Sequence, residues 1–237
     1  MNNKLNVSRL GLIEYGQALE LQQKLQMLQF EESIDDTLLL LEHYPVLTLG
    51  RRGKYENLLV KKEFLEKEKV SIHVVNRGGD ITYHGPGQLV GYLVFNLKNH
   101  GSDIKEFVYK IQEVFIRFLH DEYDIESCRN DKVFTGVWAR NEKITAIGIS
   151  VKHWITMHGF SFNINTDMEH FKWINPCGIS DKGVTSLEKL TGKRQDFDKA
   201  VEKISDFFCT VFKMERIDVK KENLLSMIEN KQVYSHH

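Results

Sequence analysis

Cysteine and proline are scarce in this chain, and neither sign of charge is in large excess. Its three cysteines, an odd number at wide spacing, argue against a disulfide framework. Lys and Arg together number 32 and Asp and Glu 33, so no overall field would recruit nucleic acid or an anionic membrane. Neither a Cys-x-x-Cys nor a His-Glu-x-x-His spacing occurs, and the sequence therefore predicts no bound metal.

Long apolar runs are missing as well. The leucine-rich run at 38–41 is far too short to span a bilayer, and residues 1–6 lack the apolar core of a signal peptide. We therefore expect a cytoplasmic protein. Because repeats and linker-like tracts are absent, the 237 residues are expected to bury one core as a single domain, 1–237. Residues 235–237, Ser-His-His, fit the remnant of a purification tag.

Periodic apolar residues predict three helices. Leu21, Leu25 and Leu28 place an amphipathic helix at about 15–31. Ser102 is the expected N-cap of a second helix, and a third follows near the end of the chain. The apolar stripes of these two helices are Ile104, Phe107, Val108, Ile111, Phe115 and Phe118, and then Phe197, Val201, Ile204 and Phe208.

Strand-like segments lie between the predicted helices, at 37–42, 46–49, 71–76 and 88–96. A meander follows at 133–165, with a hairpin turn predicted at Asn141-Glu142. Because helices and strands mix without a βαβ rhythm, we expect an α+β domain with a mixed or antiparallel sheet flanked by helices.

Residues 77–88, Arg-Gly-Gly-Asp-Ile-Thr-Tyr-His-Gly-Pro-Gly-Gln, hold four of the 16 glycines. Glycine lets a backbone adopt positive φ and approach a ligand closely, although a tight hairpin connection would use the same residues. A loop that only turns does not need an arginine, a histidine and hydroxyl groups. We therefore favour a concave polar site in which Arg77, Thr82, Tyr83, His84 and Gln88 take part.

Cys177 lies between Pro176 and Gly178, on a bend that could point a thiol into a cleft. A lone cysteine is more often a small buried hydrophobe, and Cys128 and Cys209 fit that description. The turn residues on both sides set Cys177 apart, which makes it the candidate nucleophile.

Five motifs resemble, in their order, those of the lipoyl (octanoyl) transferases of lipoate biosynthesis, and together they span roughly residues 10–190. They are Glu42-His-Tyr-Pro-Val46, the block at 77–88, Lys143-Ile-Thr-Ala-Ile-Gly148, His158-Gly-Phe-Ser-Phe-Asn-Ile-Asn165, and Asn175-Pro-Cys-Gly178 with Gly183-Val-Thr-Ser186. Tyr44 departs from the pattern, which is expected to have a second proline before Pro45.

The resemblance implies the fold shared with biotin and lipoate protein ligases, and Cys177 and Lys143 as the catalytic residues. It also implies a donor and two kinds of acceptor. The donor is octanoyl on the phosphopantetheine of acyl carrier protein, and the acceptor is a lysine of the lipoyl domains of 2-oxoacid dehydrogenases or of the glycine-cleavage H protein. No ATP, metal or other cofactor is implied. The implied substrate-binding positions are Arg77, Gly78, Gly79, Asp80, Ile81, Thr82, Tyr83, His84, Ala146, Ile147, Gly148, His158, Gly159 and Phe160.

Within this implied site, the small residues at 146–148 and 158–160 would leave space for an eight-carbon tail. His84 would polarise the thioester carbonyl or orient the catalytic pair. Acidic protein partners would be met locally, by surface lysines such as Lys61, Lys62 and Lys152, although a solvated face explains those lysines equally well.

Taken alone, Lys143 is typical of a solvated hairpin lysine. As the partner of Cys177 it would shuttle protons, because full ionisation of a thiol of pKa about 8.5 gains only roughly thirtyfold at pH 7, whereas acid–base catalysis contributes about 10²–10⁴-fold. The sequence has no Gly-x-x-x-x-Gly-Lys-[Ser/Thr] nucleotide loop. Two alternatives stay open: an octanoyl amidotransferase between lipoyl-accepting proteins, and an ATP-dependent lipoate or biotin ligase.

Overall fold

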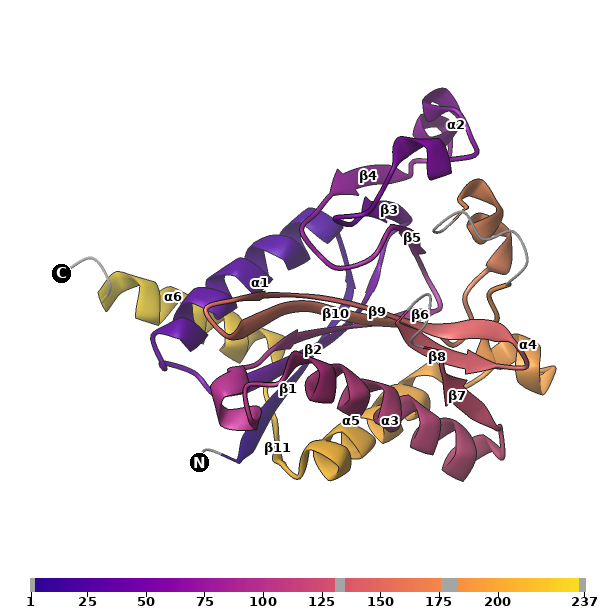
Figure 1. Cartoon of the computed structure of the whole chain (residues 1–237). Coiled ribbons are helices and arrows are strands. Elements are labelled where there is room, and N and C mark those ends of the chain that lie inside the picture. The colour runs from indigo at the N-terminus through magenta and orange to yellow at the C-terminus, as the bar shows by residue number, and fades with distance from the viewer. Residues whose placement is uncertain (1–2, 131–134, 176–182, 235–237) are drawn as a thin grey trace.

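The computed structural model describes residues 3–130, 135–175 and 183–234, which form a large sheet, a small sheet and flanking helices (Figure 1). The strands are β1 (Lys4–Ile13), β2 (Asp36–His43), β3 (Val46–Leu49), β4 (Ser71–Val74), β5 (Ile81–His84), β6 (Gln88–Val94), β7 (Ser127–Arg129), β8 (Gly136–Ala139), β9 (Glu142–Lys152), β10 (Ile155–Asn163) and β11 (Glu215–Asp218). The α-helices are α1 (Tyr15–Phe30), α2 (Lys62–Lys67), α3 (Ile104–Tyr123), α4 (Leu187–Thr191), α5 (Phe197–Phe212) and α6 (Lys221–Tyr234), and the 3-10 turns are η1 (Tyr55–Asn57), η2 (Leu97–His100) and η3 (Met168–Trp173).

The large sheet has eight strands in the order β11-β1-β2-β6-β10-β9-β8-β7. Strand β1 pairs in parallel with both β2 and β11, whereas the pairs from β2 through β7 are antiparallel. The small sheet, in the order β4-β3-β5, rises above the large one together with α2 (Figure 1). The predicted α+β class with a mixed sheet is therefore confirmed.

Two predicted boundaries are wrong by one residue. Asp103, not Ser102, caps α3, and its carboxylate accepts hydrogen bonds from the backbone N–H groups of Lys105 and Glu106 at 2.8 and 3.1 Å. Ser102 has φ 54°, whereas an N-cap needs an extended backbone. The β8–β9 hairpin turns at Arg140 and Asn141, whose φ values of 48° and 65° suit the turn types that match strand twist.

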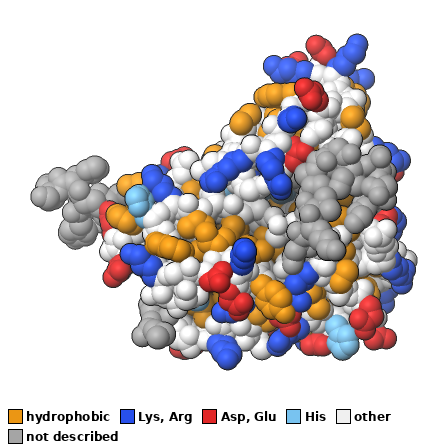
Figure 2. Space-filling model, in the orientation of Figure 1, with side chains coloured by type: hydrophobic (Ala, Val, Ile, Leu, Met, Phe, Trp, Pro, Cys, Tyr) orange, Lys and Arg blue, Asp and Glu red, His pale blue; other side chains and the backbone are white. Residues whose placement is uncertain are grey.

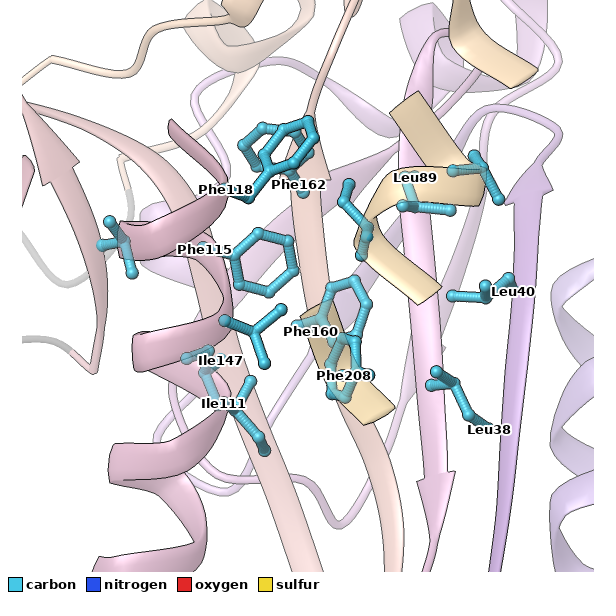
Figure 3. Close-up of a cluster of buried hydrophobic side chains, with 14 of the residues drawn as sticks. Leu38, Leu40, Leu89, Ile111, Phe115, Phe118, Ile147, Phe160, Phe162 and Phe208 are labelled. Carbon is cyan, nitrogen blue, oxygen red and sulfur yellow. The ribbon is translucent and has the colours of Figure 1, made fainter. Parts of the chain in front are cut away.

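Helices α3 and α5 cover one face of the large sheet, called here the phenylalanine face (Figures 1 and 3). Phe115 of α3 stacks on Phe162 at 5.0 Å between ring centroids and meets Phe160 edge-on at 4.7 Å. Phe208 of α5 stacks on Phe160 at 5.4 Å. These side chains are almost fully buried, and they form the largest apolar cluster of the described residues.

Helix α1 and part of α6 cover the opposite side, called here the α1 face. Leucines of α1 pack there on Leu39 and Leu41 of β2, as the predicted spacing requires. Several buried polar side chains accompany them, including Gln22, His43 and Tyr92. The two faces of one sheet therefore have different chemistry.

The small sheet has a core of its own, which contains Leu47, Leu49, Ile81 and Tyr83. Its third strand, β5, falls inside the glycine-rich stretch that the sequence indicated as one loop. Strand β5 pairs with β3 from Val46–His84 to Leu49–Ile81. The pairing was hidden because glycine flanks these four residues on both sides.

The expectation that Cys128 is buried is wrong. Cys128 is exposed on β7, and β7 is the last strand in the order of the large sheet, where one side of a strand meets solvent. Cys209 is half-buried on α5 and packs against the phenylalanine face, as expected. Cys177 lies outside the described residues. Within the described ranges, no helix has the length and apolar character needed to cross a membrane.

Candidate active site

A cavity of about 470 Å³ lies where the small sheet meets the large sheet, and its lining includes Tyr15 and Tyr92 of the α1 face and Phe160 of the phenylalanine face. Thirteen of the 14 predicted binding positions line it: Arg77, Gly78, Gly79, Asp80, Ile81, Thr82, His84, Ala146, Ile147, Gly148, His158, Gly159 and Phe160. Tyr83 does not. It is 1% exposed in the core of the small sheet, with its ring 4.8 Å from that of His170. Side chains alternate along β5, so Thr82 and His84 face the cavity while Tyr83 faces away.

Residues 77–80 form the roof of the cavity. The guanidinium of Arg77, which is 8% exposed, donates to the carbonyl oxygens of Thr48 and Asp80, both at 2.7 Å, and to the Thr48 hydroxyl at 2.8 Å. The Asp80 carboxylate accepts from the backbone N–H of Ile81 at 2.7 Å and from the side-chain amide of Asn57 at 2.6 Å. Both charged side chains thus fix the shape of the roof.

Gly148 and Gly159 lie opposite each other on β9 and β10 in the floor. The structure gives them a second reason, beside the expected space for an acyl tail. A Cβ at Gly148 would lie 2.6 Å from the carbonyl oxygen of Gly78, and one at Gly159 would collide with the carbonyl oxygen of Gly91. Gly148 therefore allows the roof to approach β9, where the Gly78 N–H donates to the Ile149 carbonyl at 3.0 Å.

Three neutral aromatic side chains, Tyr15, His84 and Tyr92, line one end of the cavity, and the ring of His43 contacts all three. His43 donates from Nδ1 to the Ile13 carbonyl at 2.8 Å, which leaves Nε2 to accept the Tyr92 hydroxyl proton at 2.7 Å. Burial lowers the pKa of His43 to about 4, and burial followed by the proximity of His43 lowers the pKa of His84 to about 3. Burial also raises the pKa of Tyr15, stacked on His84, to about 12. All four rings are therefore uncharged at neutral pH.

A chain of amides connects His84 to the strand that carries Lys143. The Gln88 amide nitrogen donates to Asn163 Oδ1 at 2.9 Å, so the Gln88 oxygen accepts from His84 Nδ1 at 2.7 Å. The Asn163 nitrogen donates in turn to the Thr185 carbonyl at 3.0 Å, and the Thr185 N–H donates to the Lys143 carbonyl at 2.9 Å. With its proton on Nδ1, His84 presents an Nε2 that can only accept a hydrogen bond.

His158 has φ 60° in the middle of β10, a conformation that costs an L-residue roughly 1–2 kcal/mol. Its backbone N–H leaves the ladder and donates to Gln22 Oε1 of α1 at 2.8 Å. Its Nε2 donates to Asn76 Oδ1 at 2.9 Å, next to the roof. The strained residue therefore connects helix α1 to the roof, and strain of this kind is often kept where it serves a site.

Lys143 lines the same cavity, with its Nζ 5.0 Å from the centroid of the Trp138 ring. Its backbone N–H donates to the Gly183 carbonyl at 3.0 Å. The Asn175 N–H donates to the Asn57 carbonyl of η1 at 2.8 Å. Cys177 belongs to the segment between these two attachment points, and it lies outside the described residues.

No three His, Cys, Asp or Glu side chains within 3–130, 135–175 and 183–234 converge as a metal site requires. The cavity combines a floor of small and apolar side chains with one amine, Lys143, and uncharged rings, and its charged residues are Arg77 and Asp80 in the roof together with Arg51 and Arg52. Such a site suits an apolar chain that ends in a reactive, uncharged carbonyl group.

A family model described as the lipoyl protein ligase A/B catalytic domain matches residues 14–209. The chain belongs to this family. An octanoyltransferase of Caldicellulosiruptor saccharolyticus is 54% identical over 228 residues, which cover 96% of this chain and 97% of that protein.

Two solved structures show the fold shared within and beyond the family. Lipoate-protein ligase A bound with ATP superposes with a TM-score of 0.73 at 14% identity, over 97% of this chain and 94% of the ligase. Biotin protein ligase from Aquifex aeolicus, in complex with biotin and ATP, gives 0.52 at 15% identity, over 89% and 70% of the two chains. The fold implied by the sequence motifs is therefore confirmed.

Several residues around the cavity escaped the sequence reasoning. They include Tyr15, Arg51, Arg52, Tyr92, Trp138 and Asn163. Tyr15 opens a helix and Tyr92 lies in an apolar strand, so each is typical of a core residue. His43 falls in the Glu-His-Tyr-Pro-Val motif, but no local pattern shows that it reaches Tyr92, 49 positions away.

Proposed function

We propose that this chain transfers an octanoyl group from acyl carrier protein to a lysine of a lipoyl domain or of the glycine-cleavage H protein, through a thioester on Cys177. The observation that carries the proposal is the position of Lys143 on the wall of a cavity whose floor is small and apolar. The relatives named octanoyltransferase, such as the one that is 54% identical, support the choice of acyl group.

The reaction has two steps. Lys143, as a neutral amine, accepts the Cys177 proton while the sulfur attacks the donor carbonyl. The bond to the pantetheine sulfur breaks, and that sulfur takes the proton back from Lys143. The acceptor amine then attacks the Cys177 thioester and loses a proton to Lys143. An amide forms as the bond from the acyl carbon to the Cys177 sulfur breaks, and that sulfur takes the proton from Lys143 and leaves as a thiol.

Of the two roles expected for His84, we propose orientation. Polarising a carbonyl oxygen requires a donor, and the His84 proton is already given to Gln88. The amide chain to Thr185 and the Lys143 carbonyl gives His84 a route to orient the strand that carries Lys143.

No nucleotide takes part in the proposed reaction, because the donor thioester is already activated and amide formation from it is downhill. The structural relatives include a lipoate ligase bound with ATP, so an ATP-dependent ligase is the alternative that the fold alone would allow. An amidotransferase between lipoyl-accepting proteins would use the same two residues with a different donor.

The deciding experiment is intact-protein mass after incubation with octanoyl acyl carrier protein and no ATP. The wild type should gain one octanoyl group that hydroxylamine removes, and Cys177→Ser and Cys177→Ala should gain none. The same adduct in either variant would remove Cys177 from the mechanism. Formation only with ATP would favour a ligase, and formation only from an octanoylated H protein would favour the amidotransferase.

Lys143→Arg separates proton transfer from simple charge. Arginine keeps the positive charge but does not release a proton near neutral pH. We expect transfer to fall on the order of 10²-fold or more at pH 7, with an unchanged melting temperature as the control. Turnover close to wild type would instead mean that Lys143 only stabilises the thiolate.

A further inference from the structure

Two exposed arginines, Arg51 and Arg52, stand at the mouth of the cavity. The Arg51 N–H donates to the Arg77 carbonyl and the Arg52 N–H to the Gly79 carbonyl, both at 3.0 Å. These bonds hold the backbone of the residues after β3 along the roof, so both side chains start from a fixed main chain. Figure 2 shows basic side chains gathered between the small sheet, at the top, and a band of hydrophobic side chains below it.

Neither arginine has an acidic partner among the described residues. The Arg51 Nε donates to the Asn76 carbonyl at 2.8 Å, which neutralises no charge. Other arginines of the chain do pair with carboxylates: Arg9 with Glu202, Arg117 and Arg129 with Glu113, and Arg216 with Glu202 and Asp206.

The positive charge of this region reaches into the cavity. Burial lowers the pKa of His158 to about 4, and Arg77 and then Arg51 add to the effect because cations disfavour a second positive charge nearby. An octanoyl thioester has no net charge. The acyl group of the proposed reaction therefore gives the arginines no partner.

The donor of the proposed reaction does carry an anion. The pantetheine arm of acyl carrier protein is a linear chain with the thioester at one end and a phosphate at the other. When the thioester carbonyl is beside Lys143, the arm has to leave the cavity through its mouth. The planar guanidinium fork suits phosphate oxygens in both geometry and charge.

We propose that Arg51 and Arg52 bind the phosphate of the donor's pantetheine arm. The inference rests on the proposed function, since it assumes a pantetheine thioester as donor. The phosphate fits better than an acidic surface of the carrier protein, because both arginines line the cavity through which the arm passes.

The test compares two small donors, octanoyl-pantetheine and octanoyl-4′-phosphopantetheine, which differ only in the phosphate. The quantity measured is the rate of Cys177 acylation per donor concentration, from intact mass at single turnover. Wild type should prefer the phosphorylated donor by about tenfold to hundredfold, the range expected for charge-assisted hydrogen bonds. Arg52→Gln should reduce this preference, and Arg51→Gln with Arg52→Gln should remove most of it.

Arg194→Gln is the matched control. Arg194 is also exposed, but it lines a different cavity beside α5, so it changes net charge by the same amount without touching the mouth. Its donor preference should equal that of wild type. Raising the ionic strength should reduce the wild-type preference, as screening of an exposed ion pair requires.

An unchanged preference in the double variant would overturn the assignment. So would a loss seen only with intact acyl carrier protein, because the arginines would then bind the protein surface. If wild type is acylated by neither small donor nor by octanoyl acyl carrier protein, the proposed function itself fails, and the phosphate site fails with it.

Discussion

Helices α3 and α5 meet one face of the large sheet with phenylalanine, whereas on the α1 face the leucines of α1 are interspersed with buried polar side chains such as Gln22, His43 and Tyr92. Rings on the phenylalanine face pack chiefly on other apolar groups, so their arrangement is set mainly by shape, although the His100 ring contacts Phe95, Phe107 and Phe212 at its edge. On the α1 face, polar atoms such as His43 Nδ1 and Gln22 Oε1 each require a partner at hydrogen-bond distance. Packing therefore determines the first face, whereas the second, whose Tyr15 and Tyr92 line the cavity, depends on hydrogen bonds as well.

The largest effect that we expect is a loss of folding stability at acid pH, caused by the buried histidines. His43 and His158 have pKa values of about 4 and His84 of about 3 in the folded chain, against about 6.5 when unfolded. Above pH 6.5 all three are neutral in both states. As the pH falls below 6.5, only the unfolded chain takes up protons, and each histidine destabilises the fold by about 1.4 kcal/mol per pH unit until about pH 4.

The measurement is the urea midpoint between pH 7.5 and pH 4.5. It should fall steeply below pH 6.5, and His84→Gln should reduce the slope by about the share of one histidine. A midpoint that stays constant over this window would show that the histidines are solvated.

Phe115→Ala tests the phenylalanine face. Removal of a fully buried ring that stacks on Phe162 should cost about 3–5 kcal/mol, which lowers the melting temperature by roughly 6–20 °C for a chain of this size. Phe30→Ala is the control, because Phe30 is 58% exposed and should change stability by no more than about 0.5 kcal/mol. Equal losses in the two variants would contradict the assigned core.

Gln22→Met tests the α1 face with a side chain of similar size. The His158 N–H loses its acceptor, at a cost of about 1–3 kcal/mol. The left-handed conformation of His158 also loses its support, so acyl transfer should fall by more than the folded fraction does.

Gln26→Met is the control for this change. Gln26 lies one turn further along α1, and its amide donates to the Ile155 carbonyl of the same strand at 3.1 Å. The loss should be about 0.5–1.5 kcal/mol with transfer retained. If the two variants lose activity equally, Gln22 contributes to packing alone.

The sequence allowed the prediction of most of the fold, and the reason is visible in particular elements. Periodicity located α1, α3 and α5, because their apolar stripes are long and regular. Strand β5 was missed because four residues between glycines carry little periodic signal. Strand β11 was missed because Glu215–Asp218 is short, polar and paired only at the sheet edge.

For the candidate site, motifs indicated the residues that surround the cavity but not what each does there. Glycine spacing at 77–79 cannot reveal that Arg77 binds carbonyl oxygens of the roof, or that Gly148 makes space for Gly78. The His43–Tyr92, Gln22–His158 and Gln88–Asn163 contacts each join residues at least 49 positions apart. Such contacts depend on the register of the finished sheet.

The pairing of β1 with β11 has a consequence for synthesis on the ribosome. Strand β1 emerges before β11, one of its neighbours, which follows about two hundred residues later. At typical translation rates that interval is roughly 10–40 s. Throughout it, β1 presents an unpaired strand edge to other nascent chains. Stalling of translation before residue 218 should therefore favour association between chains over completion of the fold.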